Sequence, residues 1–149
     1  MKYLYLFLAC IVALSACKKD KKLQADKEDD AIQKYITDHG LTATKTASGL
    51  CVVITAPGTG SGCSATSNVT VAYKGYYTDG TVFDQSDAAG VSFNLQNVIK
   101  GWTEGIPYFK EGGSGVLLVP SRLGYGEKGS GSVPGNTILI FDVKLVHVG

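Results

Sequence analysis

Two stretches of the chain alternate apolar with other residues at a period of two, and this pattern constrains the fold more than any other feature. In the first, Val69, Val71 and Tyr73 are separated by Thr70 and Ala72. In the second, apolar residues occupy every other position from 139 to 145. Successive side chains of a β-strand point to opposite faces of a sheet. Each stretch is therefore predicted to be a strand with one face in a core.

The rest of the pattern adds short strands, tight turns and two helices. Asp79-Gly80 predicts a hairpin turn, and a C′ glycine at position 40 predicts the end of a helix over 26–39. A second helix is predicted over 97–110, with Asn97 as its N-cap and Pro107 ending or kinking it. Further strands are predicted at 49–55, 81–84, 91–95, 116–120 and 137–148. We expect an α+β domain, in which an antiparallel sheet of five to six strands wraps over one short helix.

Composition excludes several classes of function. A chain of 149 residues with 44% hydrophobic and 18% charged residues is typical of one globular domain with short appendages. Its net charge of +1 is too small for nucleic-acid binding. The two histidines, His39 and His147, are not placed for a catalytic triad, and no cysteine or histidine spacing indicates a metal site. We expect no metal, cofactor or nucleic-acid partner.

The first residues indicate export. Residues 1–16 combine a lysine, an apolar run and small residues, which is typical of a signal peptide too short to span a bilayer. The sequence L-S-A-C ending at Cys17 resembles a bacterial lipobox, whose cysteine is acylated, although A-C also closes ordinary signal peptides. We expect a charged tether over 17–25 and a protein lipid-anchored at the cell envelope. The outer membrane is favoured, with the domain in the periplasm or at the cell surface.

Two cysteines remain after the signal peptide and Cys17 are set aside. Cys51 and Cys63 lie close in sequence, and an even pair in an oxidising compartment indicates a disulfide that closes a short loop. Two free buried thiols are the alternative.

The strand-rich part carries several aromatic residues and one charged residue at an unexpected place. Asp84 directly follows Val82 and Phe83 on the strand after the hairpin turn. The aromatic side chains can be ordinary core, or they can line an apolar cleft with few polar groups. Paired carboxylates for glycoside hydrolysis are a further reading, although the pattern offers few of the other groups that a sugar site needs.

Four linked motifs resemble the FKBP-type peptidyl-prolyl cis-trans isomerases. They are V-A-Y-K-G-Y-Y-T-D-G-T-V-F-D-Q-S, F-N-L-Q-N-V-I-K-G-W, V-P-S-R-L-G-Y-G and V-P-G-N-T-I-L-I-F-D-V-K-L, all within 67–149. The resemblance places the isomerase domain at 67–149, with the N-terminal helix and first strand in 26–66. It implies rotation of X-Pro bonds in proline-containing polypeptides, and we expect a monomer.

The resemblance also implies a site. Trp102 would form the floor of an apolar cleft, and the Ile99 N–H and the Tyr125 hydroxyl would donate hydrogen bonds to carbonyl groups of the bound peptide. Asp84 completes the predicted catalytic set. The substrate-binding positions are Tyr73, Phe83, Val91, Phe93, Val98, Val133 and Phe141.

Some positions depart from the family pattern. Val91 stands where an aromatic residue is common, and V-P-G-N-T-I-L replaces the usual last loop. These departures leave open a holdase chaperone that binds peptides in the same cleft without useful catalysis. A glycan-binding surface lipoprotein is a third possibility, because the charged tether would suit it.

Asp84 then needs a particular local structure. In a regular strand Phe83 and Asp84 would face opposite sides of the sheet, so placing both at one cleft requires a bend or bulge. We expect Tyr73 to donate a hydrogen bond to the Asp84 carboxylate, which then has an orienting and electrostatic role and is not a general base.

Overall fold

The fold is built on one twisted antiparallel sheet. The structure, a computed structural model, describes the backbone of residues 4–149 and the side chains of residues 17–149. Within these residues the sheet has seven strands in the order β1-β2-β6-β7-β3-β4, and β5 pairs with β3. The strands are β1 Thr44–Lys45, β2 Cys51–Ala56, β3 Asn68–Tyr76, β4 Val82–Gln85, β5 Val91–Asn94, β6 Ser114–Val119 and β7 Leu139–Val148. The predicted antiparallel α+β fold is confirmed, with seven strands where five to six were expected.

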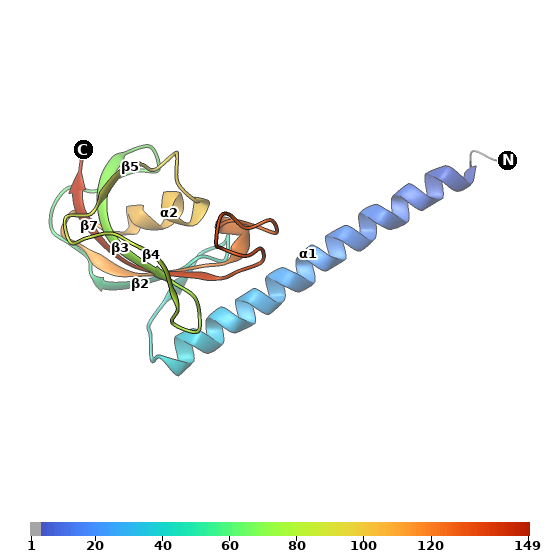
Figure 1. The fold of residues 1–149 in the computed structure, drawn as a ribbon, viewed down its shortest axis with the longest axis horizontal. Coiled ribbons are helices and arrows are strands. Elements are labelled where there is room, and N and C mark those ends of the chain that lie inside the picture. Colours follow the sequence, from blue (N-terminus) through green and yellow to red (C-terminus); the bar gives the residue numbers. More distant parts are fainter. Residues whose placement is uncertain (1–3) are drawn as a thin grey trace.

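The sheet curves around a short helix, α2, which spans Lys100–Gly105 (Figure 1). A 3₁₀ turn over Ile106–Tyr108 follows directly. The prediction of one helix over 97–110 was therefore too long. The backbone N–H of Asn97 donates to the Asn94 carbonyl at 2.9 Å, so Asn97 belongs to a turn and the predicted N-cap was wrong. Pro107 lies in the first turn of the 3₁₀ segment, where its missing N–H does no harm.

Both faces of the central strands are covered. Leu50 and Val52 pack in a core cluster with Trp102 on the α2 side of the sheet. Cys51 and Val53 pack in a second cluster with Ile32 on the opposite side. Alternate residues of a strand face opposite sides, so a strand buried on both faces is apolar throughout. This double burial explains the unbroken apolar runs of β2 and β6.

The second cluster is covered by α1, a helix that spans Leu4–Asp38 and extends far beyond the sheet (Figure 1). It is much longer than the predicted 26–39, because the charged segment 17–25 continues the helix. Lysine, glutamine and alanine are good helix formers even where little is buried. The predicted C-terminal end is confirmed: Gly40 has φ of 60° and donates to Thr37 at 3.2 Å, and Leu41 donates to Ile36 at 2.9 Å. These two bonds satisfy the last helical carbonyl groups.

A buried carboxylate fastens α1 to the loop after β6. Glu28 is only 4% exposed. Its two oxygens accept hydrogen bonds from the Ser121 backbone N–H at 2.8 Å and the Ser121 hydroxyl at 2.6 Å. Gln24 donates a third bond at 2.7 Å. Beside it, Asp29 pairs with Arg122 at 3.2 Å. The loop that starts at Ser121 is thus fixed relative to the helix.

Replacing Glu28 with alanine is expected to lower the free energy of unfolding by about 1–3 kcal/mol, because it leaves the buried N–H and hydroxyl of Ser121 without acceptors. Urea denaturation measures the change. The matched control is Asp38→Ala, which removes an exposed ion pair with Lys34 and should change stability by less than about 0.5 kcal/mol. Equal effects of the two substitutions would show that the buried bonds do not hold the helix.

The two predicted disulfide partners are free thiols. Cys51 is buried against α1, whereas Cys63 packs at the edge of the cluster on the other face of the sheet. The sheet separates them, so the predicted Cys51–Cys63 disulfide is not formed. Burial raises the pKa of both thiols, which makes them poor nucleophiles at neutral pH.

The predicted signal peptide, 1–16, lies outside the residues whose side chains are described, whereas the Cys17 side chain is exposed. In the described part of the chain, no helix combines the length and the apolar character needed to span a membrane.

Candidate functional site

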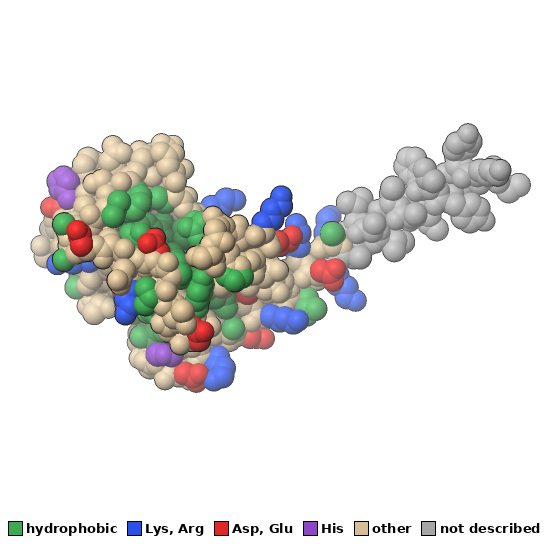
Figure 2. Space-filling model, in the orientation of Figure 1, with side chains coloured by type: hydrophobic (Ala, Val, Ile, Leu, Met, Phe, Trp, Pro, Cys, Tyr) green, Lys and Arg blue, Asp and Glu red, His purple; other side chains and the backbone are tan. Residues whose placement is uncertain are grey.

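A cleft of about 420 Å³ opens between the sheet, α2 and the loop after β6. Figure 2 shows hydrophobic side chains gathered on this face of the domain, with an acidic side chain beside them. Most of the ten lining residues are aromatic or aliphatic, and one of the ten carries a carboxylate. The lining residues are Tyr73, Phe83, Asp84, Phe93, Asn97, Val98, Ile99, Trp102, Tyr125 and Phe141.

Trp102 forms the floor of the cleft. It is 4% exposed and projects from α2 toward the sheet. Three aromatic rings meet it nearly edge to face: Tyr73 at 5.1 Å, Phe93 at 5.5 Å and Phe141 at 5.4 Å between ring centroids. Such pairs are favourable because the positive edge of one ring meets the negative face of the other. The floor is therefore rigid and apolar.

A glycine lets two further rings close the wall. Phe83 and Phe141 pack edge to face at 5.6 Å over Gly75 of β3. A Cβ added to Gly75 would lie 2.7 Å from the Phe83 ring and 2.9 Å from the Phe141 ring. Both rings would then have to move, so the glycine in Y-K-G-Y is required by the packing of the wall.

The predicted bulge beside Asp84 is confirmed. Gly75 pairs with Asp84 and Tyr76 with Val82, so Phe83 is an extra residue in β4. Extra residues of this kind re-aim the neighbouring side chains. As a result Phe83 and Asp84 both line the cleft although they are adjacent in sequence. The Tyr73 hydroxyl donates to the Asp84 carboxylate at 2.7 Å, which is also as predicted.

This hydrogen bond affects the pKa of Tyr73. Burial, and next the neighbouring Asp84 carboxylate, raise the pKa of Tyr73 from 10.0 to about 12. Both causes favour the neutral phenol in the folded state. The contribution of neutral Tyr73 to the free energy of unfolding is therefore complete below pH 10. It is lost as the pH rises from 10 through about 12, where the phenol ionises in the folded protein. The bond is intact at any neutral pH.

Alkaline titration of tyrosinate absorbance is expected to show this shift. The difference between the wild type and Tyr73→Phe should give one tyrosine with a pKa of about 12, and Asp84→Asn should lower that value toward the ordinary one. The difference is needed because Tyr76, which is partly buried and bonded to Asp142, also has a raised pKa. A Tyr73 titration centred near 10 in the folded protein would contradict the Tyr73–Asp84 contact.

Two hydrogen-bond donors at the mouth of the cleft have no acceptor among the residues that the structure describes. The Ile99 residue precedes α2 with extended backbone angles, φ of −59° and ψ of 148°. Neither its N–H nor the Tyr125 hydroxyl donates a hydrogen bond to another described residue. Tyr125 is 39% exposed. An apolar cleft with two unused donors at its rim can hold an apolar ring and bind the carbonyl groups on either side of it.

Two predicted substrate-binding residues lie elsewhere. Val91 is 43% exposed and is absent from the cleft lining. Residues two apart in a strand are separated by about 6.6 Å, so Phe93 faces Trp102 while Val91 lies beyond the rim. Val133 is buried in the core cluster and also does not line the cleft. Phe93, two residues farther along β5, does line the cleft and packs against Trp102.

Sequence reasoning missed Asn97 and Gly75. Asn97 was taken for a helix cap, but it lines the cleft. Its place in the turn before α2 was not visible in the periodicity of the segment. Among residues 17–149, no group of three acidic, histidine or cysteine side chains lies close enough to hold a metal ion.

The chain matches the family of FKBP-type peptidyl-prolyl cis-trans isomerases over residues 60–146. A relative from Neisseria meningitidis serogroup B, named a probable FKBP-type peptidyl-prolyl cis-trans isomerase FkpA, is 43% identical over 140 residues, which are 92% of this chain and 51% of the relative. The crystal structure of FkpA from Escherichia coli superposes with a TM-score of 0.74 at 34% identity, covering 99% of this chain and 70% of that one. A peptidyl-prolyl cis-trans isomerase structure from Pseudomonas syringae pv. tomato has a TM-score of 0.72 at 30% identity, covering 83% and 95%.

The relatives are longer proteins. This chain spans 51% to 59% of the length of three curated relatives, from Neisseria meningitidis, Haemophilus influenzae and Aeromonas hydrophila. The match to the family includes every residue that lines the cleft.

Proposed function

Because this chain belongs to the FKBP-type peptidyl-prolyl cis-trans isomerase family, we propose that it speeds the rotation of X-Pro peptide bonds in exported polypeptides. The observation that carries the proposal is the apolar cleft itself, in which the Trp102 floor is ringed by three aromatic side chains. A proline ring is the apolar, compact group that such a cleft fits.

The proposed mechanism needs no nucleophile. A planar amide is stabilised by resonance that places negative charge on oxygen and positive charge on nitrogen, and this resonance makes the barrier to rotation about 18–20 kcal/mol. Water favours the charge-separated planar form. In the cleft, Trp102, Phe93 and Phe141 replace water with apolar surface. The twisted amide, which is less polar, is then favoured relative to the planar one, and the barrier falls.

The polar groups at the rim have a positioning role in this mechanism. The Ile99 N–H and the Tyr125 hydroxyl are free to donate to carbonyl oxygens of the chain on either side of the proline. The Asp84 carboxylate, held by the Tyr73 hydroxyl at 2.7 Å, places negative charge at one edge of the cleft. It orients the Tyr73 ring at the cleft and does not transfer a proton. These groups fix the flanking chain while the X-Pro bond turns.

A protease-coupled assay with a short X-Pro peptide tests the proposal. The wild type should increase the rate of cis-to-trans conversion above the uncatalysed rate, which corresponds to tens to hundreds of seconds. Tyr125→Phe, which loses one donor and keeps the ring, should retain part of the activity. A folded wild-type protein that gives no rate increase would sink the proposal.

A holdase chaperone without catalysis has less support from the structure than from the sequence. One motive for it was an open wall at Val91, but Val91 does not line the cleft. The altered loop V-P-G-N-T-I-L remains, and its Asn136 has an unusual positive φ of 55°. Suppression of aggregation by a protein that is inert toward X-Pro peptides would favour the holdase.

We also propose that Cys17 is acylated and anchors the protein to an envelope membrane, with the domain on the periplasmic or external side. The L-S-A-C motif and the exposed Cys17 side chain support this. Metabolic labelling with a radioactive fatty acid tests it: label should enter the wild type and not Cys17→Ser. Equal labelling of the two proteins, or none, would remove the proposal.

A further inference from the structure

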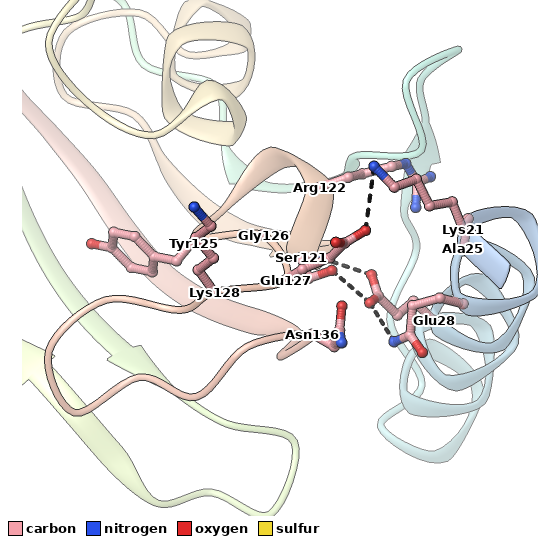
Figure 3. A pocket seen from close by; sticks show the side chains of 11 residues that line it. Lys21, Ala25, Glu28, Ser121, Arg122, Tyr125, Gly126, Glu127, Lys128 and Asn136 are labelled. Carbon is pink, nitrogen blue, oxygen red and sulfur yellow. Dashed lines mark hydrogen bonds and ion pairs between the residues drawn. The ribbon is translucent and has the colours of Figure 1, made fainter. Parts of the chain in front are cut away.

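A second and larger cavity lies next to the cleft, between α1 and the loop after β6. It measures about 570 Å³, and most of the surface that lines it is apolar. We call it the helix groove. Figure 3 shows α1 on one side and the loop on the other, with Tyr125 at the end of the groove farthest from the helix. The lining residues are Lys21, Gln24, Ala25, Glu28, Ser121, Arg122, Tyr125, Gly126, Glu127, Lys128 and Asn136.

Tyr125 belongs to both cavities. It lines the cleft together with Trp102 and lines the helix groove together with Ala25. The two cavities therefore adjoin each other at one exposed side chain. A polypeptide that places its proline over Trp102 and bonds to the Tyr125 hydroxyl must leave the cleft past this residue or in the opposite direction. The groove is a ready path for the first of these exits.

The groove is built by fixed contacts. The buried Glu28 carboxylate holds the loop through the N–H and hydroxyl of Ser121 (Figure 3). A second contact, between Lys21 and Glu127 at 3.5 Å, spans the groove from helix to loop. The helix and the loop are thus joined at two separate points. A flanking segment would bind to a preformed surface, which lowers the entropic cost of binding.

Most charged side chains that line the groove are paired with another described residue, and one lysine is not. Glu28 is bonded to Ser121, Glu127 pairs with Lys21, and Arg122 pairs with Asp29 outside the groove lining. Lys128 is left without an ion pair among the described residues. It lies near Tyr125 in Figure 3. The charge that remains for a ligand is positive and close to the junction with the cleft.

From this arrangement we infer that the helix groove binds the segment of the substrate polypeptide that flanks the proline, with a preference for an acidic residue beside Lys128. The inference rests on the proposed isomerase function and extends it. The cleft would select the proline, and the groove would favour long, extended, acidic-flanked chains over short peptides. Because the two subsites act on one chain, occupation of one raises the effective concentration at the other.

Fluorescence anisotropy with labelled peptides tests the inference on the full chain. One probe is a short X-Pro peptide that fills only the cleft. The others are peptides of about a dozen residues, roughly 40 Å when extended, with glutamate or lysine residues flanking the proline. Ala25→Trp fills the groove from a helical position, and Ala31→Trp is the matched control because Ala31 is exposed on the same helix outside the groove.

The ratio of long-peptide to short-peptide affinity is expected to fall about tenfold in Ala25→Trp and to keep the wild-type value in Ala31→Trp. Lys128→Glu should reverse the preference for glutamate over lysine flanks, whereas Lys110→Glu, outside the groove, should not. An unchanged ratio in Ala25→Trp would overturn the inference, and so would a wild type that binds neither long peptide. A change of oligomeric state in Ala25→Trp by sedimentation would also overturn it, since the occupant would then be a second copy.

Failure of the inference and failure of the proposed function give different results. If the wild type binds the acidic-flanked peptide in the groove but does not speed X-Pro rotation, the groove stands and the isomerase function falls. If the wild type is an active isomerase whose ratio is insensitive to Ala25→Trp, the function stands and the groove falls.

Discussion

Trp102→Ala is expected to lower the free energy of unfolding by about 3–5 kcal/mol and to remove measurable isomerase activity. Trp102 is 4% exposed and is the shared partner of Tyr73, Phe93 and Phe141. Its loss leaves a cavity and deprives three edge-to-face contacts of their common ring. Urea denaturation gives the stability change, and the protease-coupled assay gives the activity.

Two controls separate the floor of the cleft from a general loss of aromatic surface. Tyr108→Ala removes a ring that is 44% exposed and should change stability by about 0.5 kcal/mol or less. Trp102→Phe keeps an aromatic floor and removes a buried indole N–H that has no hydrogen-bond partner. It should cost less stability than alanine and retain part of the activity. Full activity in folded Trp102→Ala would contradict the role of the floor.

Asp84→Ala is expected to lower kcat/KM by about tenfold, which corresponds to roughly 1.4 kcal/mol of transition-state stabilisation. The carboxylate is exposed at the edge of the cleft, and its loss frees the Tyr73 hydroxyl and removes negative charge from the site. Stability should change by less than about 0.5 kcal/mol, because Asp84 is exposed and the freed Tyr73 hydroxyl lies at the open cleft, where it can bond to water.

The matched control for Asp84 is Asp30→Ala, which removes an exposed carboxylate from α1, far from the lining of the cleft. It should leave kcat/KM unchanged. Asp84→Asn separates charge from shape, since the amide can still accept the Tyr73 hydrogen bond. Undiminished activity in Asp84→Ala would make this aspartate an ordinary surface charge.

The sheet was largely predictable because its signals are local, whereas the cleft residues followed from the resemblance of four motifs to a known family. Alternation at period two placed β3 and β7, and the Asp79-Gly80 turn indicated the hairpin between β3 and β4. The bulge at Phe83 was also predictable, because only an extra residue can bring two consecutive side chains to one cleft. The Tyr73–Asp84 hydrogen bond followed from the need of a carboxylate for a donor.

The features that sequence reasoning missed depend on contacts between distant segments. The charged stretch 17–25 has no apolar periodicity, so its continuation of α1 could not be inferred from burial. The helix groove forms where α1 meets the loop after β6, and the Glu28–Ser121 bond that joins them links residues 93 apart in sequence. Cys51 and Cys63 were paired by number and compartment, but the sheet lies between them. Val91 was assigned to the site because of its place in a family motif, whereas the structure shows that Phe93 lines the cleft and Val91 does not.

The central claim is that an apolar cleft ringed by aromatic side chains, in a member of the FKBP-type family, catalyses X-Pro rotation. The most direct measurement is NMR exchange spectroscopy on a short X-Pro peptide with a catalytic amount of wild-type protein. Cross-peaks between the cis and trans forms should appear at mixing times of about a second, although the uncatalysed exchange takes tens to hundreds of seconds. If the folded wild-type protein is present and the exchange is no faster than in the peptide alone, the result would contradict the claim.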